Sequence, residues 1–138
     1  MKNNKKLVVD KYTQPIFIPN DLYVVKNYTK EDIQKLFIWQ DDVEVEEREI
    51  MDGQGVTCAF MYRKGDKNKN LCVVLLLNTL ECNLSNPEDA INIIGHEAHH
   101  ATYDILDYCS IKLTDDTTEV YSFLNGWITQ CAYKTYMK

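Results

Sequence analysis

The segment from residue 96 to residue 100, His-Glu-Ala-His-His, places the strongest constraint on how this chain folds. It has the form His-Glu-x-x-His, and all three histidines of the sequence lie inside it. On an α-helix, His96 and His100 share one face about one turn apart, so both imidazoles can reach a single ion. Glu97 lies about 100° further round the helix, where it flanks such an ion and can accept a proton. The segment therefore predicts a helix that carries a zinc site.

The residues around this motif have the pattern of one long helix, from about residue 87 to residue 108 or 109. A Ser or Asn cap precedes Pro87 at the first helical position, and two acids follow in the first turn. One apolar stripe is expected to pack on a sheet, and it consists of Ala90, Ile94, Ala98, Ala101 and Ile105. The two motif histidines fall on a different stripe, together with Tyr103 and Asp107. The helix is thus predicted to have a core face and a separate chemical face.

The residues before this helix favour β-strands. Leu71–Leu77 is apolar throughout, so we expect a strand that is buried on both sides. Residues 56–63 form a second clear strand, and the polar residues between the two predict a hairpin. Two earlier strands are expected at 6–12 and at Asp21–Lys26.

Two segments between these strands have other patterns. Thr29 has the features of an N-cap and predicts a short helix that runs to about Trp39. In the acidic run 41–49, Val43 and Val45 alternate with acids, which favours a half-exposed strand. Charge runs are usually solvated faces, so a wall that selects basic substrates is the weaker interpretation of this run.

A second long helix is expected at about 117–136, after a short connection. The predicted fold class is therefore α+β. A small antiparallel or mixed sheet in the N-terminal half packs against the motif helix and a C-terminal helix, and residues 1–138 form a single domain.

Charge and cysteine usage exclude several classes of protein. A net charge of −6 and a pI near 5.0 argue against a nucleic-acid or anionic-membrane surface. The basic N-terminal residues are not followed by the apolar core of a signal peptide, and the longest apolar run is too short to span a bilayer. The five cysteines include no Cys-x-x-Cys pair, which favours a reduced protein. We therefore expect a cytoplasmic location.

Two histidines leave a catalytic zinc site one protein ligand short. The metzincin pattern needs Gly at 103 and His at 106, and Tyr103 and Leu106 exclude it. Glu119, in the first turns of the next predicted helix, is the better third ligand. It precedes Phe123 by one turn and borders an apolar stripe, so its carboxylate is expected to face inward. Four acids are the alternatives for this role, namely Asp104, Asp107, Asp115 and Asp116.

With these residues the chain resembles the gluzincin-type zinc metallopeptidases, which carry His-Glu-x-x-His on one helix and a glutamate on the next. Its size is similar to that of the minimal gluzincins and of small zincin peptidases of phages and bacteria. The resemblance covers roughly residues 71–128. It implies that His96, His100 and Glu119 are zinc ligands and that Glu97 is the general base.

The resemblance also bears on the substrate and on the residues around the metal. It implies that Leu71–Leu77, or a strand beside it, holds an extended peptide. Thermolysin-like members have an Asp one turn after the ligand glutamate, where this chain has Phe123, so Asp104 or Asp107 is expected to orient a histidine instead. His99 is expected at the rim of the cleft. The candidates for stabilising the oxyanion are Tyr103, Tyr121 and Tyr133.

The predicted function is zinc-dependent hydrolysis of peptide bonds. A water activated by Zn2+ attacks the carbonyl of a peptide or protein substrate, and Glu97 takes up its proton. Neither nucleic acid nor a membrane is expected as a partner. Two other interpretations remain open: a zinc-binding assembly or interaction module that retains the site without peptidase activity, and a coincidental motif in a structural protein.

Overall fold

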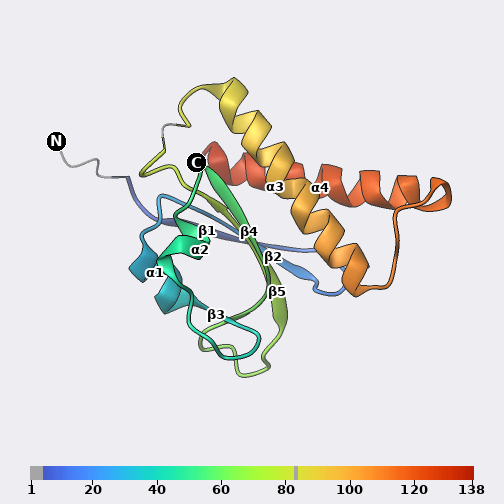
Figure 1. The fold of residues 1–138 in the computed structure, drawn as a ribbon, viewed down its shortest axis with the longest axis horizontal. Coiled ribbons are helices and arrows are strands. Elements are labelled where there is room, and N and C mark those ends of the chain that lie inside the picture. The colour runs from blue at the N-terminus through green and yellow to red at the C-terminus, as the bar shows by residue number, and fades with distance from the viewer. Residues whose placement is uncertain (1–4, 83) are drawn as a thin grey trace.

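The computed structural model describes residues 5–82 and 84–138, so residues 1–4 of the basic N-terminal segment lie outside it, as does residue 83. The described residues form one five-stranded sheet with helices on both faces (Figure 1). The α+β class predicted from the sequence is confirmed. In chain order the elements are β1 (Val8–Thr13), β2 (Asp21–Lys26), α1 (Lys30–Leu36), β3 (Phe37–Trp39), α2 (Glu47–Ile50), β4 (Gly55–Arg63), β5 (Leu71–Leu77), α3 (Pro87–Tyr108), a 3-10 turn (Asp115–Thr117) and α4 (Thr118–Tyr136).

The strand order is β1-β2-β5-β4-β3. The neighbours β2 and β5 run parallel, and every other neighbouring pair is antiparallel, so the sheet is mixed. The predicted hairpin of β4 and β5 is confirmed. Because β5 pairs with β2 on one side and with β4 on the other, it is internal and has no free edge.

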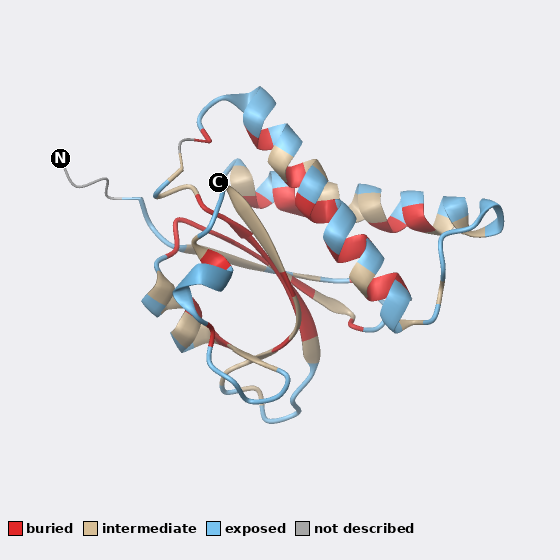
Figure 2. Ribbon diagram, viewed as in Figure 1, coloured by how far each residue is buried: buried red, intermediate tan, exposed pale blue. Residues whose placement is uncertain are grey.

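Two apolar cores lie on opposite faces of the sheet (Figure 2). One face packs on α3 and α4, and the other packs on α1 and α2. Successive side chains of a strand point to opposite faces, so a strand covered on both sides needs an apolar residue at every position. In β5, Val73, Leu75 and Leu77 enter the first core, and Cys72, Val74 and Leu76 enter the second. The prediction that β5 is buried on both sides is confirmed.

Helix α3 begins where the sequence predicts. The side chain of Asn86 caps it by accepting a hydrogen bond from the backbone N–H of Glu88 at 3.0 Å, and Pro87 is the first helical residue. All five residues of the predicted apolar stripe are at most 2% exposed. The other predicted stripe is exposed along its length at His96, His100, Tyr103 and Asp107. The prediction that the apolar stripe is buried and that the motif histidines lie on a separate, exposed stripe is therefore confirmed.

Two predictions about the segments between the strands are wrong. The helix after Thr29 ends at Leu36 rather than at Trp39, because Phe37–Trp39 pairs with the end of β4 instead. The acidic run is not a strand. Val45 is buried but Val43 is exposed, and Glu47–Ile50 is a helix.

The physical reason for the second error is local hydrogen bonding. The backbone N–H of Glu46 donates to the Glu49 carboxylate at 2.8 Å, which closes a helical turn. The alternation of Val43 and Val45 with acids is too short a pattern to favour a strand over such a helical turn. Among residues 5–82 and 84–138, no helix has both the length and the apolar character needed to cross a bilayer.

Strand β4 lies unusually close to α3, and Gly55 makes this approach possible. A Cβ atom at Gly55 would lie 2.7 Å from Cγ2 of Ile93 and 2.9 Å from Cγ of Glu97. Further along the strand, the rings of Phe60 and Tyr108 have centroids 5.1 Å apart. The absence of a side chain at residue 55 thus sets the distance between the sheet and the part of α3 that carries the motif.

Replacing Gly55 by Ala should force β4 and α3 apart. We expect a loss of about 1–3 kcal/mol in the free energy of unfolding, the usual cost of overpacking. Gly126→Ala is the matched control, because a Cβ at Gly126 in α4 meets no atom within 4 Å. That control should stabilise the protein by about 0.5–1 kcal/mol through helix propensity. Urea unfolding of both variants measures the difference, and equal effects would contradict the close approach.

Candidate metal centre

The two motif histidines converge on one point above the middle of α3. Nε2 of His96 lies 3.1 Å from Nε2 of His100, with ring centroids 4.8 Å apart and ring planes at 72°. Two nitrogens at ~2.0–2.1 Å from a tetrahedral zinc lie ~3.3 Å apart, close to this separation. The same distance suits a hydrogen bond between two neutral imidazoles. The His96 side chain is 63% exposed, so the point of convergence is open to solvent.

Glu97 has a different environment from the histidines beside it. Its side chain is only 8% exposed, because it points from α3 towards β4. Oε2 accepts a 2.6 Å hydrogen bond from the hydroxyl of Thr57, and Oε1 lies 3.9 Å from Nε2 of His96. One carboxylate oxygen is therefore anchored to the sheet, while the other lies next to the histidine pair.

Thr57 contacts the motif residue Glu97, and the sequence did not reveal this contact. Its hydroxyl also lies 3.0 Å from the backbone carbonyl oxygen of Glu97, so it contacts both the side chain and the main chain of that residue. Thr57 faces α3 because it alternates with Cys58, which enters the opposite core. A threonine in a strand is unremarkable in sequence. Only the packing of β4 against the motif helix reveals that Thr57 contacts Glu97.

The structure does not bring Glu119 to the histidine pair. Among the described residues, no three His, Cys, Asp or Glu side chains form a group that could hold a metal ion. Helices α3 and α4 approach each other at Thr102 and Asn125, where the side-chain oxygens are 3.4 Å apart. Glu119 lies ~9 Å of helical rise nearer the start of α4 than Asn125. Its role as third ligand stays a prediction.

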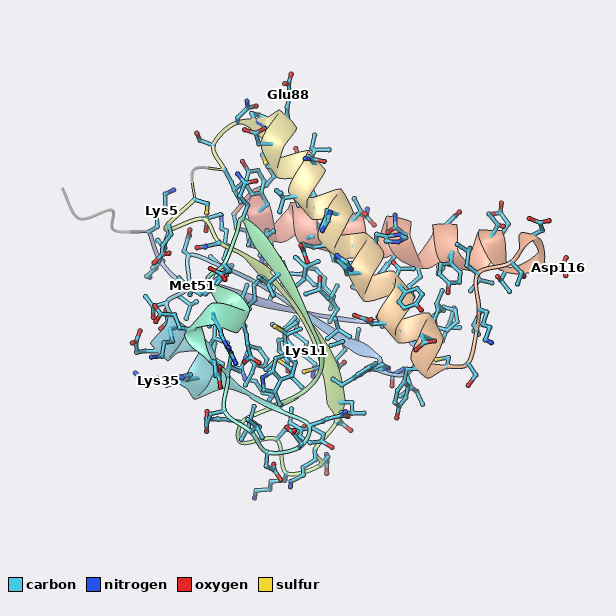
Figure 3. All side chains as sticks on the ribbon, in the orientation of Figure 1. Lys5, Lys11, Lys35, Met51, Glu88 and Asp116 are labelled. Atoms are coloured by element: carbon cyan, nitrogen blue, oxygen red, sulfur yellow. The ribbon has the colours of Figure 1, made fainter. Side chains whose placement is uncertain are left out.

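The surroundings of Glu119 differ from those expected. Glu119 and Phe123 are both exposed, so the expectation of an inward-facing carboxylate is wrong. The helix buries Tyr121 and Leu124 instead. The 3-10 turn before α4 places this end of the helix at the outer tip of the molecule, where Figure 3 labels Asp116.

His99 and Asp104 lie close to the two motif histidines, and their surroundings differ. His99 lines a hollow of about 210 Å3 between α3 and α4, together with Thr102, Ser122 and Asn125. Asp104 is half-buried, and burial raises the pKa of its carboxyl while His100 acts in the opposite direction. Asp104 thus lies within electrostatic range of His100, although no hydrogen bond joins its carboxyl to the ring.

The three tyrosine candidates lie in different surroundings. Tyr103 is exposed on the same stripe of α3 as the two motif histidines. Tyr121 is buried, and its hydroxyl donates to the carbonyl of Ile111 at 3.1 Å, so its proton is already engaged. Tyr133 is exposed towards the other end of α4. Of the three, Tyr103 has the position that suits contact with a substrate at the histidines.

Strand β4 offers a free edge beside the motif. Its residues 61–63 pair with β3, and the carbonyl of Phe60 accepts a hydrogen bond from the N–H of Gln40. Within the described part of the chain, no strand pairs with residues 55–59 on the side away from β5. Thr57 lies in this stretch, so the unpaired edge runs past the Glu97 carboxylate.

Comparisons of the chain with protein-family models, with curated proteins and with solved structures give no match. The interpretation of the site therefore depends on its residues and their geometry.

Replacing Thr57 by Val should destabilise the protein by about 1–3 kcal/mol, because the buried Glu97 carboxylate loses its hydroxyl donor. Thr57→Ser keeps the hydroxyl and is the matched control, with a smaller loss. Urea unfolding at neutral pH measures both. A Val variant as stable as the parent would show that the hydrogen bond to Glu97 does not hold β4 to α3.

Proposed function

We propose that this protein is a zinc-dependent peptidase of the gluzincin type, with a zincin-like fold. The observation that carries the proposal is the convergence of His96 and His100 on one exposed point, with a buried, anchored Glu97 beside it. Any helix would bring the two histidines together, but a coincidental motif would not require Glu97 to be buried and held by Thr57. The sheet packed against a motif helix and a C-terminal helix is consistent with this proposal.

The chemistry of the three proposed donors fits zinc, although only the two histidines lie together in the part of the chain that the structure describes. Neutral imidazole nitrogens and a carboxylate oxygen are its usual ligands in hydrolases, and three protein ligands leave one position open. His96 and His100 would hold the ion, and Glu119 is the proposed third ligand on the resemblance to gluzincins. When bound, zinc polarises a carbonyl and lowers the pKa of water towards neutrality.

The position of Glu97 supports a proposed role in proton transfer. A general base needs an oxygen free to accept and a fixed position from which to do so. Thr57 holds Oε2, which leaves Oε1 on the side of His96. We assign to Glu97 the uptake of the proton from the attacking water and its delivery to the leaving amine. Thr57 is a positioning residue, since it acts through Glu97.

The substrate would be held as an extra strand. An extended peptide can add to an unpaired sheet edge through main-chain hydrogen bonds. Because β5 is internal, we assign this role to residues 55–59 of β4, the strand beside it. A peptide bound there passes close to Glu97, because Thr57 contacts that residue.

Replacing Glu97 by Gln should keep the bound zinc and reduce peptide cleavage by about 10²–10⁴-fold, the usual contribution of a general base. Glu88→Gln is the matched control, because Glu88 is exposed in the first turn of the same helix. The assay combines zinc per chain, by elemental analysis, with cleavage of a peptide library. Chelation should abolish cleavage in the parent, and added zinc should restore it.

The outcomes separate the alternatives. Full zinc content without cleavage in the parent would favour an assembly or interaction module that keeps the site. A folded parent that takes up no zinc would contradict the metal centre itself. A Gln variant as active as the parent would remove the role given to Glu97.

A further inference from the structure

A second, unrelated feature lies where α4 ends, near the N-terminal segment. An open cavity of about 490 Å3 is formed there by the ends of β1 and β2, the connection before α3 and the last residues of the chain. This volume is within the range of small-molecule sites. Four lysines line it, namely Lys5, Lys6, Lys26 and Lys138, and no acid does so among the described residues. Figure 3 labels Lys5 at this end of the molecule.

Lys26 is the least accessible of these cations. It is only 9% exposed, and its ammonium group donates to the backbone carbonyl of Tyr136 at 2.9 Å. This carbonyl belongs to the last turn of α4, where a cation is favourable. A lysine ammonium has three donors, however, so capping the helix uses only one of them. Burial lowers the pKa of Lys26 and the charge of Lys5 lowers it further, while the charge of Asp10 acts in the opposite direction.

The charge of the cavity is only partly compensated. Lys138 lies 2.7 Å from the carboxylate of Asp10, and Thr135 donates to the other oxygen of that carboxylate. Asp10 is thus occupied by Lys138 and Thr135. Capping of α4 explains Lys26 but not the presence of Lys5 and Lys6 on the same wall. Bringing like charges together costs free energy unless an anion offsets the repulsion.

The polar wall beside the lysines is held in place by its own hydrogen bonds. The hydroxyl of Thr79 accepts from the N–H of Asn27 at 2.8 Å and donates to its side-chain oxygen at 2.6 Å. The side-chain amide of Asn27 donates to the carbonyl of Lys6 at 2.9 Å, which fixes the backbone of that lysine at the rim. These bonds fix the polar wall and the backbone of Lys6 beside the cavity.

We propose that this cavity binds a small molecule that carries a multiply charged oxyanion, a phosphate or polycarboxylate group. Charge-assisted hydrogen bonds from lysines are strong and suit such groups. The proposal is independent of the metal centre, because it shares no residue with it. A long polyanion is a poor fit, since the protein as a whole carries a net charge of −6 and the basic residues line a hollow rather than a stripe.

The test is a titration of the full chain with inorganic pyrophosphate at fixed ionic strength, followed by calorimetry and by amide NMR. We expect saturable binding with shifts at Lys26, Asn27 and Thr79. Lys26→Met should weaken binding about 10-fold or more. The double variant Lys5→Gln with Lys6→Gln alters exposed side chains only, and it should weaken binding as well. Lys67→Gln, on the β4–β5 connection, is the control and should change nothing.

Citrate and a short DNA oligonucleotide complete the design. Pyrophosphate preferred over citrate identifies a phosphate ligand, and the reverse identifies a polycarboxylate; both support the site. The proposal would be overturned if potassium chloride caused the same shifts. It would also be overturned if pyrophosphate still bound to both sets of lysine variants. Tighter binding of the oligonucleotide at the same amides would replace the small molecule with a nucleic acid.

Discussion

The contact between β4 and α3 is the constraint on which the candidate metal centre depends. Gly55 lets the strand approach the helix, and Thr57 then reaches the carboxylate of Glu97 at 2.6 Å. A buried carboxylate without such a partner would be costly. The contact therefore does two things at once: it attaches the helix to the sheet and fixes the orientation of the one motif residue that needs a defined position. The histidines need no such support, since the helix backbone alone sets their spacing.

Helix α3 carries the residues that stabilise the fold and the residues of the candidate metal centre on different stripes. One stripe of α3 lies in the core against the sheet and α4, and the stripe with His96 and His100 remains exposed. Changes on the exposed stripe should alter metal binding with little effect on folding, because surface substitutions seldom matter for stability. Glu97 is the exception, because it lies between the two stripes. Its carboxylate contacts both the sheet, at Thr57, and the histidine pair, at His96, so replacing it should affect both folding and metal binding.

The sequence predicted most of the elements because their signals are local. Asn86 and Pro87 specify the start of α3, and the unbroken apolar run of β5 requires burial on both faces. One error arose where a tertiary contact decides, at Phe37–Trp39, which joins the sheet although its spacing suits a helix. The error in the acidic run has a local cause, the helical turn closed by the Glu49 carboxylate. In the site, the spacing of the motif predicted the histidine pair. Thr57 could not be predicted, since its role depends on which strand lies beside α3.

The central claim is that His96 and His100 bind one zinc ion together, and X-ray absorption at the zinc edge tests it most directly. The measurement uses protein loaded with one zinc per chain, beside a Glu119→Ala variant. We expect two imidazole nitrogens at ~2.0–2.1 Å with oxygen in the remaining positions, and one oxygen fewer from protein in the variant. Sulfur ligands at ~2.3 Å, or a single imidazole in the parent, would contradict the claim.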